Sequence, residues 1–392
     1  MSRACCKTTV LAFLAIIFAV PVFQGIWEKT VEGESPRVLA LFKKVPSDAN
    51  LRAFEKDLEE SSKVAAWLRP AYRQLRWWLM RDLGDKAVAG ADGWAYYGPD
   101  IHYLSERYFR DLKSARSEDD PAETVVDFAR QLADRNIHLL VVPVPAKPSV
   151  APERLGRSLR PSLALSVHTR RFMEELRGRG VDVLDLDTPL VHEQSEHPEH
   201  PRLYLAADTH WTGDGTRVAA ALVATRVREI LGRDAQPKRS YRREPMTVLR
   251  HPDIPRMSRL PREASAFPPE STVAYRVLDE SGEPYSDSDD AQILLLGDSF
   301  SRIYQTDEPE AAGLIANLAY ELGTPLSSIV NDGGASTLVR QELARTPELL
   351  DGKRLVIWAF VERDLRFGMK GWQKIALDQS PSPAKGDVGA AD

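Results

Sequence analysis

The run Gln292-Ile-Leu-Leu-Leu296 leads directly into the turn Gly297-Asp-Ser-Phe300. A short, continuous apolar run that ends at a glycine-containing turn predicts a buried strand, and an apparent helix resumes beyond the turn. Such a strand delivers the hydroxyl of Ser299 to the edge of a sheet. We therefore take this strand as the centre of the predicted fold.

Short apolar segments and amphipathic segments alternate along the chain after residue 90. The apolar segments predict five strands, at residues 138–144, 181–186, 293–296, 328–330 and 355–360. Helical spacing predicts helices at residues 122–135, 165–179, 215–231, 310–322 and 337–349. This alternation is typical of an α/β fold, a doubly wound parallel sheet with helices on both faces. The stretch 236–290 is instead predicted to be rich in loops, with room for short antiparallel strands.

A second informative string is Asp208-Thr-His-Trp211. In an extended chain alternate residues point to the same side, so Asp208 could orient the imidazole of His210 through one ring nitrogen. Thr212 is the predicted N-cap of the next helix, and Trp211 is predicted to wall the pocket. Taken alone, the string also fits a loop aspartate beside a surface histidine.

Nucleophilic acyl transfer by serine requires a base within hydrogen-bond reach and a third group that orients the base. Ser299, His210 and Asp208 supply these three groups. The backbone N–H of Ser299 and the dipole of the following helix are expected to stabilise an oxyanion. Asp298 is expected to hold the turn through local hydrogen bonds. The alternative is that Ser299 only caps a helix.

The uncharged apolar run Val10–Phe23 follows Arg3 and Lys7. With its neighbours it approaches the roughly 20 residues that a bilayer span needs. It predicts a secretory signal or an uncleaved signal-anchor, and we favour an inner-membrane anchor because no Ala-x-Ala cleavage site follows. A buried core helix is the third alternative. The positive-inside rule places the rest of the chain outside the cytoplasm. Cys5 and Cys6 precede the run, so they fall on the cytoplasmic side and are not expected to pair.

Composition divides the chain into an anchor segment at residues 1–29, a linker and helical arm at 30–89, a catalytic domain at 90–378 and a disordered tail at 379–392. Helical spacing from residue 50 to residue 80 predicts the arm, with a break or kink at Pro70. Trp77 and Trp78 are predicted to pack onto the catalytic domain. A position at the membrane interface is the alternative.

Charge and histidine content exclude some other classes of function. The formal net charge of −5 gives no electrostatic reason to expect nucleic acid as a partner. His192, His197 and His200 lie in a polar stretch whose spacing matches no zinc pattern, so we interpret it as a solvated loop. The sequence therefore predicts neither a metal nor a cofactor.

The paired strings carry a family resemblance. Asp208-Thr-His-Trp-Thr212 with the later Gly297-Asp-Ser-Phe300 resembles the alginate O-acetyltransferases of the AlgJ and AlgX type, a branch of the SGNH hydrolase-like proteins. Ala91-Asp-Gly-Trp-Ala-Tyr-Tyr97 and Val356-Ile-Trp-Ala-Phe-Val-Glu-Arg-Asp364 are similar to two further segments of that family. The resemblance covers roughly residues 45–375. Since the chain ends soon after its last predicted strand, we expect no carbohydrate-binding module, as in the AlgJ-like form.

The resemblance implies an SGNH-hydrolase-like fold and a periplasmic O-acetyltransferase. Ser299 would take the acetyl group, His210 would act as general base and then as acid–base partner of the acceptor hydroxyl, and Asp208 would orient His210. The acceptor would be a secreted polysaccharide, alginate-like or another exopolysaccharide. A membrane-bound O-acyltransferase would supply the acetyl group.

A second oxyanion donor is expected in Asn331-Asp-Gly-Gly334, which follows a predicted strand. The Asn331 amide or the backbone amides, Gly333 among them, could serve, and a plain turn is the alternative. Arg302 and Tyr304 follow the nucleophile, where they either contact substrate or lie on a helix surface.

Three further charged residues are candidates for the same edge of the sheet. Lys147 follows the strand at residues 138–144 and is a candidate for binding an anionic sugar. Glu362 and Arg363 are predicted to form a structural ion pair near the site, with a substrate role as the alternative.

Two other functions use the same residues differently. With water as the attacking group, the three side chains would make an SGNH-type carbohydrate esterase. With a broken geometry, the chain would be a non-catalytic polysaccharide-binding subunit of a secretion complex.

Overall fold

The computed structural model describes residues 3–42, 47–106, 108, 120–156, 167–197, 201–232, 239–258, 267–368 and 371–377. The chain divides into two compact units, and each is described by itself below. The helical unit comprises residues 1–82 and 259–264, and the body comprises residues 83–258 and 265–392. The body thus begins before the predicted boundary at residue 90, because the strand β1 (Ala87–Ala89) pairs with β2 (Ala95–Tyr97) in a hairpin.

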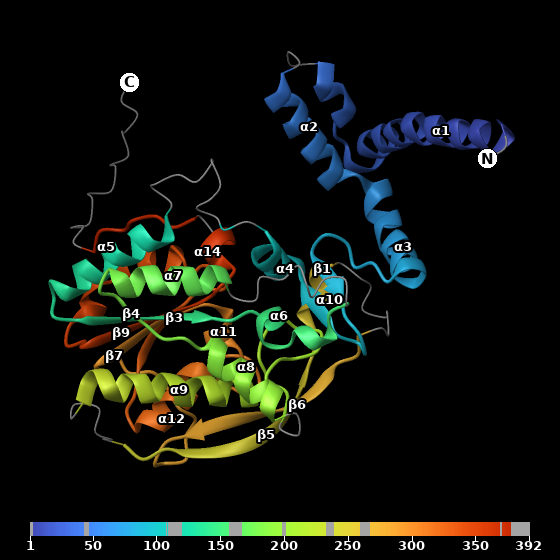
Figure 1. Cartoon of the computed structure of the whole chain (residues 1–392). Helices are drawn as coiled ribbons and strands as arrows, with labels where there is room; N and C mark the ends of the chain where they lie inside the picture. Colours follow the sequence, from blue (N-terminus) through green and yellow to red (C-terminus); the bar gives the residue numbers. More distant parts are fainter. Residues whose placement is uncertain are drawn as a thin grey trace, which may run out of the picture. The chain divides into compact units, whose positions relative to one another are not determined.

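A five-stranded parallel sheet forms the centre of the body (Figure 1). Its strand order is β4-β3-β9-β7-β8. The strands are β3 (His138–Val144), β4 (Asp182–Val183), β7 (Ile293–Gly297), β8 (Ser327–Val330) and β9 (Leu355–Val361). The predicted parallel sheet is confirmed, and the strand at 138–144 matches its predicted bounds.

Helices cover both faces of this sheet (Figure 1). The side chains of successive strand residues alternate between two apolar clusters: Leu140 and Leu295 belong to one, and Val141 and Leu294 to the other. The first cluster includes α9 (Gly213–Leu231) and α12 (Leu314–Leu322), and the second includes α5 (Pro121–Ala133), α7 (Val167–Gly178) and α13 (Leu338–Arg345). The doubly wound arrangement is therefore as predicted.

Short helices and turns connect these elements along the body. They are α4 (Gly98–Ser105), α6 (Lys147–Val150), α8 (Asp187–Glu196), α10 (Asp253–Met257), α11 (Ser299–Arg302) and α14 (Asp364–Phe367), with 3-10 turns at Pro152–Arg154 and Pro347–Leu350.

The edge strand β4 is shorter than the predicted strand at 181–186. The carboxylate of Asp185 accepts hydrogen bonds from the backbone N–H groups of Asp187 (2.9 Å) and Thr188 (3.3 Å). Such local bonding turns the chain out of the sheet and starts α8. The predicted helix at 310–322 also begins later, at Leu314, after Gly313 at its N-cap.

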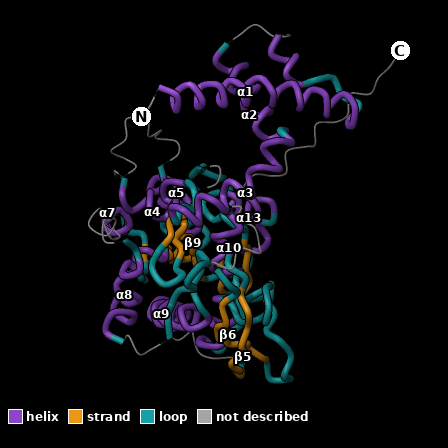
Figure 2. Tube along the Cα trace, turned by 90° about the vertical axis from the view of Figure 1, so that its right-hand side faces the viewer, coloured by secondary structure: helices purple, strands orange, loops and turns teal. Residues whose placement is uncertain are grey.

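The stretch 236–290, predicted to be rich in loops, contains a long antiparallel ribbon. Strands β5 (Arg242–Arg250) and β6 (Glu270–Leu278) pair over nine residues each, and Figure 2 shows them side by side. Charged residues interrupt both strands because much of the ribbon is only half-buried, so neither strand has the continuous apolar run that identified the central sheet. The expected antiparallel strands are therefore present, but they are longer than the sequence predicted.

The helical unit contains α1 (Arg3–Trp27), a π-helical turn at Glu28–Glu32, a 3-10 turn at Arg37–Phe42, α2 (Asp48–Ser61) and α3 (Lys63–Met80). The arm breaks at Ser62 and not at Pro70, which lies inside α3. Ser62 has an extended backbone, and its hydroxyl caps α3 by accepting the N–H of Ala65 at 3.2 Å. Ser62 therefore supplies the cap and the change of direction that the sequence analysis assigned to Pro70.

Within the described part of the chain, one helical stretch, Phe13–Glu32, is long and apolar enough to cross a membrane. The predicted apolar run Val10–Phe23 lies in α1. The predicted tail at 379–392 and His200, which was predicted to lie in a solvated loop, are outside the described residues.

Candidate active site

The turn after β7 is held by Asp298. Its carboxylate accepts the backbone N–H of Phe300 at 2.9 Å and, across the sheet, the N–H of Val361 at 2.8 Å. A Cβ at Gly297 would overlap the side chain of Ser301, so the turn requires glycine at this position. The cap of α11 is Asp298, and Ser299 is the first residue of the helix. Ser299 is therefore not an N-cap, and its hydroxyl is free of that structural role.

The Asp-Thr-His-Trp segment forms a tight loop that leads into α9. Leu205 N–H donates to the carbonyl of His210 at 3.1 Å, and Thr212 N–H donates to the carbonyl of Leu203 at 2.9 Å. Thr212 caps α9 as predicted, accepting the N–H of Gly215 at 3.1 Å. A Cβ at Gly215 would overlap the Leu203 carbonyl, so this glycine lets the helix start directly against the loop.

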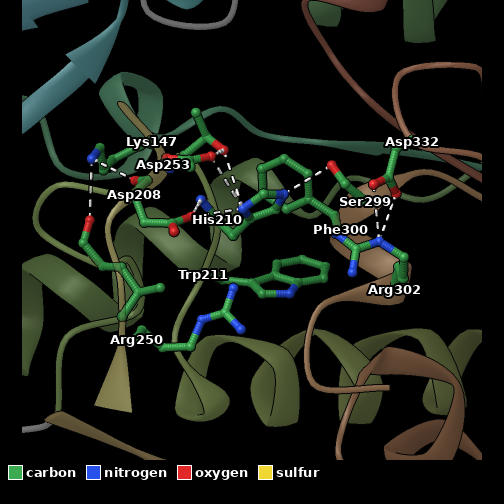
Figure 3. Close-up of polar contacts among 12 residues, drawn as sticks. Lys147, Asp208, His210, Trp211, Arg250, Asp253, Ser299, Phe300, Arg302 and Asp332 are labelled. Atoms are coloured by element: carbon green, nitrogen blue, oxygen red, sulfur yellow. Dashed lines mark hydrogen bonds and ion pairs between the residues drawn. The ribbon is translucent and has the colours of Figure 1, made fainter. Parts of the chain in front are cut away.

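The structure brings the three predicted reacting side chains together (Figure 3). The Oγ of Ser299 lies 2.8 Å from Nε2 of His210, and Nδ1 of His210 lies 2.7 Å from Oδ1 of Asp208. Asp208 Oδ1 also accepts the backbone N–H of His210 at 3.1 Å. One carboxylate thus fixes both the imidazole and its backbone, leaving Nε2 directed at the serine hydroxyl.

The negative charges of Asp208 and Asp253 stabilise the protonated imidazole of His210. Burial alone would lower the pKa of His210, but the hydrogen bond and charge of Asp208, with a further contribution from the charge of Asp253, raise it above its usual value. Burial acts to raise the pKa of Asp208, and the bonds to His210 outweigh it and lower that pKa. His210 is therefore a stronger base than a free histidine, as proton abstraction from serine requires.

Aromatic rings pack behind the imidazole. The Phe300 ring centre lies 5.0 Å from that of His210 and 5.2 Å from that of Trp211, with the Trp211 contact edge-to-face. Trp211 is fully buried and does not line the cavity. The prediction that Trp211 walls the pocket was wrong: it supports Phe300, which restricts the orientation of His210.

A cavity of about 730 Å³ opens over Ser299 and His210. The arginines that line it are Arg250, Arg256, Arg302 and Arg363, its acidic residues include Asp208, Asp253, Asp307, Glu308, Asp332 and Asp364, and His251 also lines it. Tyr97, Leu249, Met257 and Phe367 add apolar surface. The mixture of hydrogen-bonding groups and apolar faces suits a sugar, which presents hydroxyls and C–H faces together.

The backbone amides of Ser299 and Gly333 lie at this cavity, and neither has a hydrogen-bond partner among the described residues. Gly333 lines the cavity with a φ of +69°, which glycine adopts without strain. The backbone N–H of Asn331 instead donates to the carbonyl of Gly297 at 3.1 Å, and its side-chain oxygen lies against Gly334. Of the two predicted oxyanion donors the geometry therefore favours Gly333 and disfavours Asn331.

Arg302 and Tyr304 have different surroundings. Arg302 lines the cavity, and its guanidinium contacts the carboxylates of Asp332 (2.7 Å) and Asp307 (2.5 Å). Tyr304 is fully buried with a φ of +60°, below the guanidinium of Arg250. Tyr304 therefore neither contacts substrate nor lies on a surface, and both alternatives given for it were wrong.

Lys147 is also fully buried, which excludes the predicted contact with an anionic sugar. Its ammonium donates to the carbonyls of Leu205 (3.1 Å), Ala206 (2.9 Å) and Asp208 (2.7 Å), as Figure 3 shows in part. Burial lowers its pKa to about 8. Lys147 thus uses its three donors to hold the loop that carries Asp208.

Replacing Lys147 by methionine is expected to lower the free energy of unfolding by about 3 kcal/mol, because three carbonyls lose their donor at about 1 kcal/mol each. Acetyl transfer should also fall, since Asp208 loses its support. Denaturant melts and initial rates measure the two effects. Lys353→Met is the matched control, because Lys353 is a buried lysine with one carbonyl partner, Asp289, at 2.6 Å. Equal losses in the two variants would contradict this role for Lys147.

Glu362 and Arg363 do not form the predicted ion pair with each other. Glu362 is fully buried and accepts from Ala146 N–H (2.8 Å), and its two oxygens also accept from the hydroxyls of Ser149 and Thr169 (2.5 Å each). Burial raises its pKa to about 7. The Arg363 guanidinium instead lies 2.8 Å from Asp100.

Asp253, at the start of α10, was not among the residues predicted from the sequence. Its carboxylate accepts the N–H (2.8 Å) and the hydroxyl (2.6 Å) of Thr209 and lies 3.7 Å from Nδ1 of His210. Nothing in the surrounding Pro252-Asp-Ile-Pro255 marks this aspartate as functional. Asp208, His210 and Asp253 are close enough to hold a metal ion. Their ligand atoms already hydrogen-bond to one another or to Thr209, so the arrangement fits support of the imidazole better.

Asp253→Asn is expected to shift the acidic limb of the pH–rate profile to lower pH. The charge of Asp253 contributes to the raised pKa of His210, so its removal lowers that pKa, and neutral His210 persists to lower pH. The value of kcat/KM should fall about 10-fold, the loss expected when the amide of asparagine weakens the charged hydrogen bonds that Thr209 donates to Asp253. Asp182→Asn on the edge strand β4 removes the same charge away from the site, so an equal shift in that control would contradict the assignment.

A parallel sheet that presents a serine, a histidine and an aspartate in hydrogen-bond contact at its carboxyl edge defines the class of serine-dependent acyl hydrolases and acyltransferases. The family model described as SGNH hydrolase-like domain, acetyltransferase AlgX, matches residues 87–362, and the chain belongs to this family. The family resemblance of the paired strings is thereby confirmed.

Several relatives agree with this assignment. The chain is 24% identical over 323 residues to the "Probable alginate O-acetylase AlgJ" of Azotobacter vinelandii, covering 80% of this chain and 78% of that protein. The fold is similar to that of the O-acetyltransferase domain of Pseudomonas putida AlgJ, with a TM-score of 0.54, 21% identity and coverage of 71% of this chain and 91% of that one. It is also similar to Pseudomonas aeruginosa AlgX, with a TM-score of 0.53, 18% identity and coverage of 70% and 61%.

Proposed function

We propose that the protein is an extracytoplasmic O-acetyltransferase that moves an acetyl group, through an ester on Ser299, onto hydroxyls of a secreted polysaccharide. The observation that carries the proposal is the 2.8 Å contact between Ser299 Oγ and His210 Nε2, with Asp208 bonded to the other ring nitrogen. Family membership and the names of the relatives support acetyl transfer as the reaction.

In the first half-reaction Ser299 Oγ attacks the carbonyl carbon of the acetyl donor, and His210 Nε2 takes the hydroxyl proton. The N–H groups of Ser299 and Gly333 would bind the resulting oxyanion. As the carbon–oxygen bond to the donor breaks, His210 returns the proton to the leaving oxygen. The acetyl group then remains as an ester on Ser299.

In the second half-reaction a sugar hydroxyl attacks the acetyl carbonyl while His210 takes its proton. The ester bond to Ser299 breaks, and His210 gives the proton to Ser299 Oγ. The acetylated sugar leaves and the original serine is restored. Asp208 stays ionised throughout and stabilises the imidazolium that forms twice.

Transfer differs from hydrolysis only in the group that reaches the ester. The cavity is large enough for a sugar unit, and charged, polar and apolar groups line it. These properties support a sugar, and not only water, as the acceptor. The family resemblance implies that a membrane-bound O-acyltransferase supplies the acetyl group. Helix α1 would attach the protein to the inner membrane, with the body in the periplasm.

The test uses the full chain in detergent with an activated acetyl ester and a panel of neutral and acidic oligosaccharides. Mass spectrometry of the sugars is expected to detect acetylated products whose formation depends on the chain. Free acetate alone across the whole panel would favour the esterase. Absence of any ester turnover would favour the non-catalytic binding subunit.

A further inference from the structure

Helix α3 of the helical unit has an unusual composition. Residues 63–81 contain five basic side chains and no acidic one, together with Trp67, Trp77, Trp78 and Tyr72. The preceding helix α2 has the opposite character, with five acidic and two basic residues at 48–61. Two adjacent helices of one unit therefore present opposite charge.

Six large side chains of α3 face solvent, whereas Trp77 is buried. Trp67 is 79% exposed and Trp78 is 73% exposed. Four more exposed residues, Leu68, Tyr72, Leu75 and Leu79, share this face. At 100° per residue the six side chains occupy an arc of about 140°, and Arg69, Arg73 and Arg76 lie beside that arc. A helix in a water-soluble protein normally buries such an arc.

An exposed apolar face of this size indicates an interaction surface. One side of α3 carries tryptophan, tyrosine and leucine, and arginines lie at the border of that side. This pattern is typical of a helix that lies in the plane of a membrane interface. Each basic residue near an anionic surface contributes about 1 kcal/mol of attraction. The acidic helix α2 would be repelled by the same surface.

The structure also connects α3 to the end of the candidate membrane helix. Gln24, near the end of α1, accepts the backbone N–H of Lys63, the first residue of α3, at 2.9 Å. Its amide donates to Glu28 (2.9 Å) and to the carbonyl of Ser61 (3.3 Å). Gln24 and Glu28 are both buried. The start of α3 is therefore fixed to α1 at Gln24, directly after the apolar run Val10–Phe23.

From these observations we propose that α3 lies in the headgroup layer of the bilayer that holds α1, with the Trp67–Trp78 arc directed toward the acyl chains. The proposal rests on α1 being the membrane anchor, and it does not depend on the chemistry at Ser299. Basic side chains at the border of the arc, among them Arg76 with its ion-pair partner Asp82, would face the lipid headgroups. A second copy of the chain or a protein partner on this face is the competing occupant.

The test uses the full chain with Cys5→Ser and Cys6→Ser, reconstituted in nanodiscs of phosphatidylcholine with anionic phosphatidylglycerol. A spin label is placed at one new cysteine: Ala71→Cys on the apolar arc, Ala66→Cys on the opposite face of α3, or Ala53→Cys on α2. All three positions are exposed in the structure. Collision rates with oxygen, which concentrates in lipid, and with a nickel chelate, which stays in water, report the depth of each label.

The label at Ala71 is expected to collide more with oxygen than with nickel, and the labels at Ala66 and Ala53 are expected to show the reverse. Adding Trp67→Ser and Trp78→Ser should lower the oxygen preference at Ala71. Three results would overturn the proposal: nickel access at Ala71 equal to that at Ala53, spin–spin coupling between copies at Ala71, or an oxygen preference unchanged by the tryptophan substitutions.

Discussion

Ser299→Ala is expected to lower the rate of acetyl transfer from an activated ester to an oligosaccharide by about 10⁶-fold, the loss seen when the nucleophile of a serine triad is removed. The hydroxyl is the only atom of the residue that lies 2.8 Å from His210 Nε2 and can carry the acetyl group. The fold should remain intact, because Asp298 and not Ser299 caps α11. Initial rates of sugar acetylation and a denaturant melt measure the two effects.

Ser301→Ala is the matched control for this substitution. Ser301 lies on the same turn and is fully buried, and its hydroxyl has no hydrogen-bond partner among the described residues. Its removal should leave the rate close to that of the wild type. If the Ser299 variant kept wild-type transfer, the acyl-enzyme route would be excluded.

Asp208→Asn is expected to reduce kcat by about 10⁴-fold, as in serine triads that lose this carboxylate. An amide cannot stabilise the imidazolium that forms in each half-reaction, and it favours the wrong tautomer of His210. The substitution acts directly on His210, because Asp208 Oδ1 lies 2.7 Å from His210 Nδ1. The value of kcat/KM measured across pH tests it.

The sign of the pH effect follows from the pKa of His210. Catalysis needs the neutral imidazole, so the rate rises with pH through the pKa of His210, which Asp208 raises. Without the carboxylate that pKa falls, and the acidic limb of the residual activity should lie at lower pH. A wild-type maximal rate with an unmoved acidic limb would contradict the role given to Asp208.

The proximity of the three candidate residues Ser299, His210 and Asp208 could be predicted in part because parallel sheets follow strict rules. Ser299 follows an apolar strand, and such sheets bring the ends of their strands to one edge. Asp208 and His210 lie two residues apart, a spacing that predicted a shared side in an extended chain. In the structure a tight loop brings them together instead, with Asp208 Oδ1 bonded to both the imidazole and the backbone N–H of His210. The contact between Ser299 and His210, which are far apart in the sequence, could not be predicted from local spacing. It was predicted from the joint occurrence of the two motifs.

Burial of polar residues could not be predicted in the same way. Lys147 follows a strand end, where a charged side chain is expected to face solvent. Its ammonium turns inward because the carbonyls of the loop at 205–208 provide acceptors, and that loop is distant in sequence. Tyr304 and Trp211 are similar cases, since local spacing places a residue near the site without showing whether it faces the cavity.

Asp253 was missed for a related reason. Asp253 accepts a hydrogen bond from Thr209, and its negative charge lies close to His210. Neither contact can be predicted from the residues next to Asp253 in the sequence. The break of the helical arm was assigned to Pro70, the stronger breaker by type, yet α3 begins just after Ser62 and runs through Pro70 to Met80. Proline in a helix interior is disfavoured but tolerated, and the capping hydroxyl decided the boundary.

The most direct test of acyl transfer is to locate the acetyl group on the enzyme. The full chain is mixed with an activated acetyl ester without an acceptor, quenched in acid, digested and mapped by mass spectrometry. We expect one acetyl group on the peptide that contains Ser299, lost when an acceptor oligosaccharide is added before the quench. An acetyl group at another residue that passes to the sugar while Ser299 stays unmodified would contradict catalysis through Ser299.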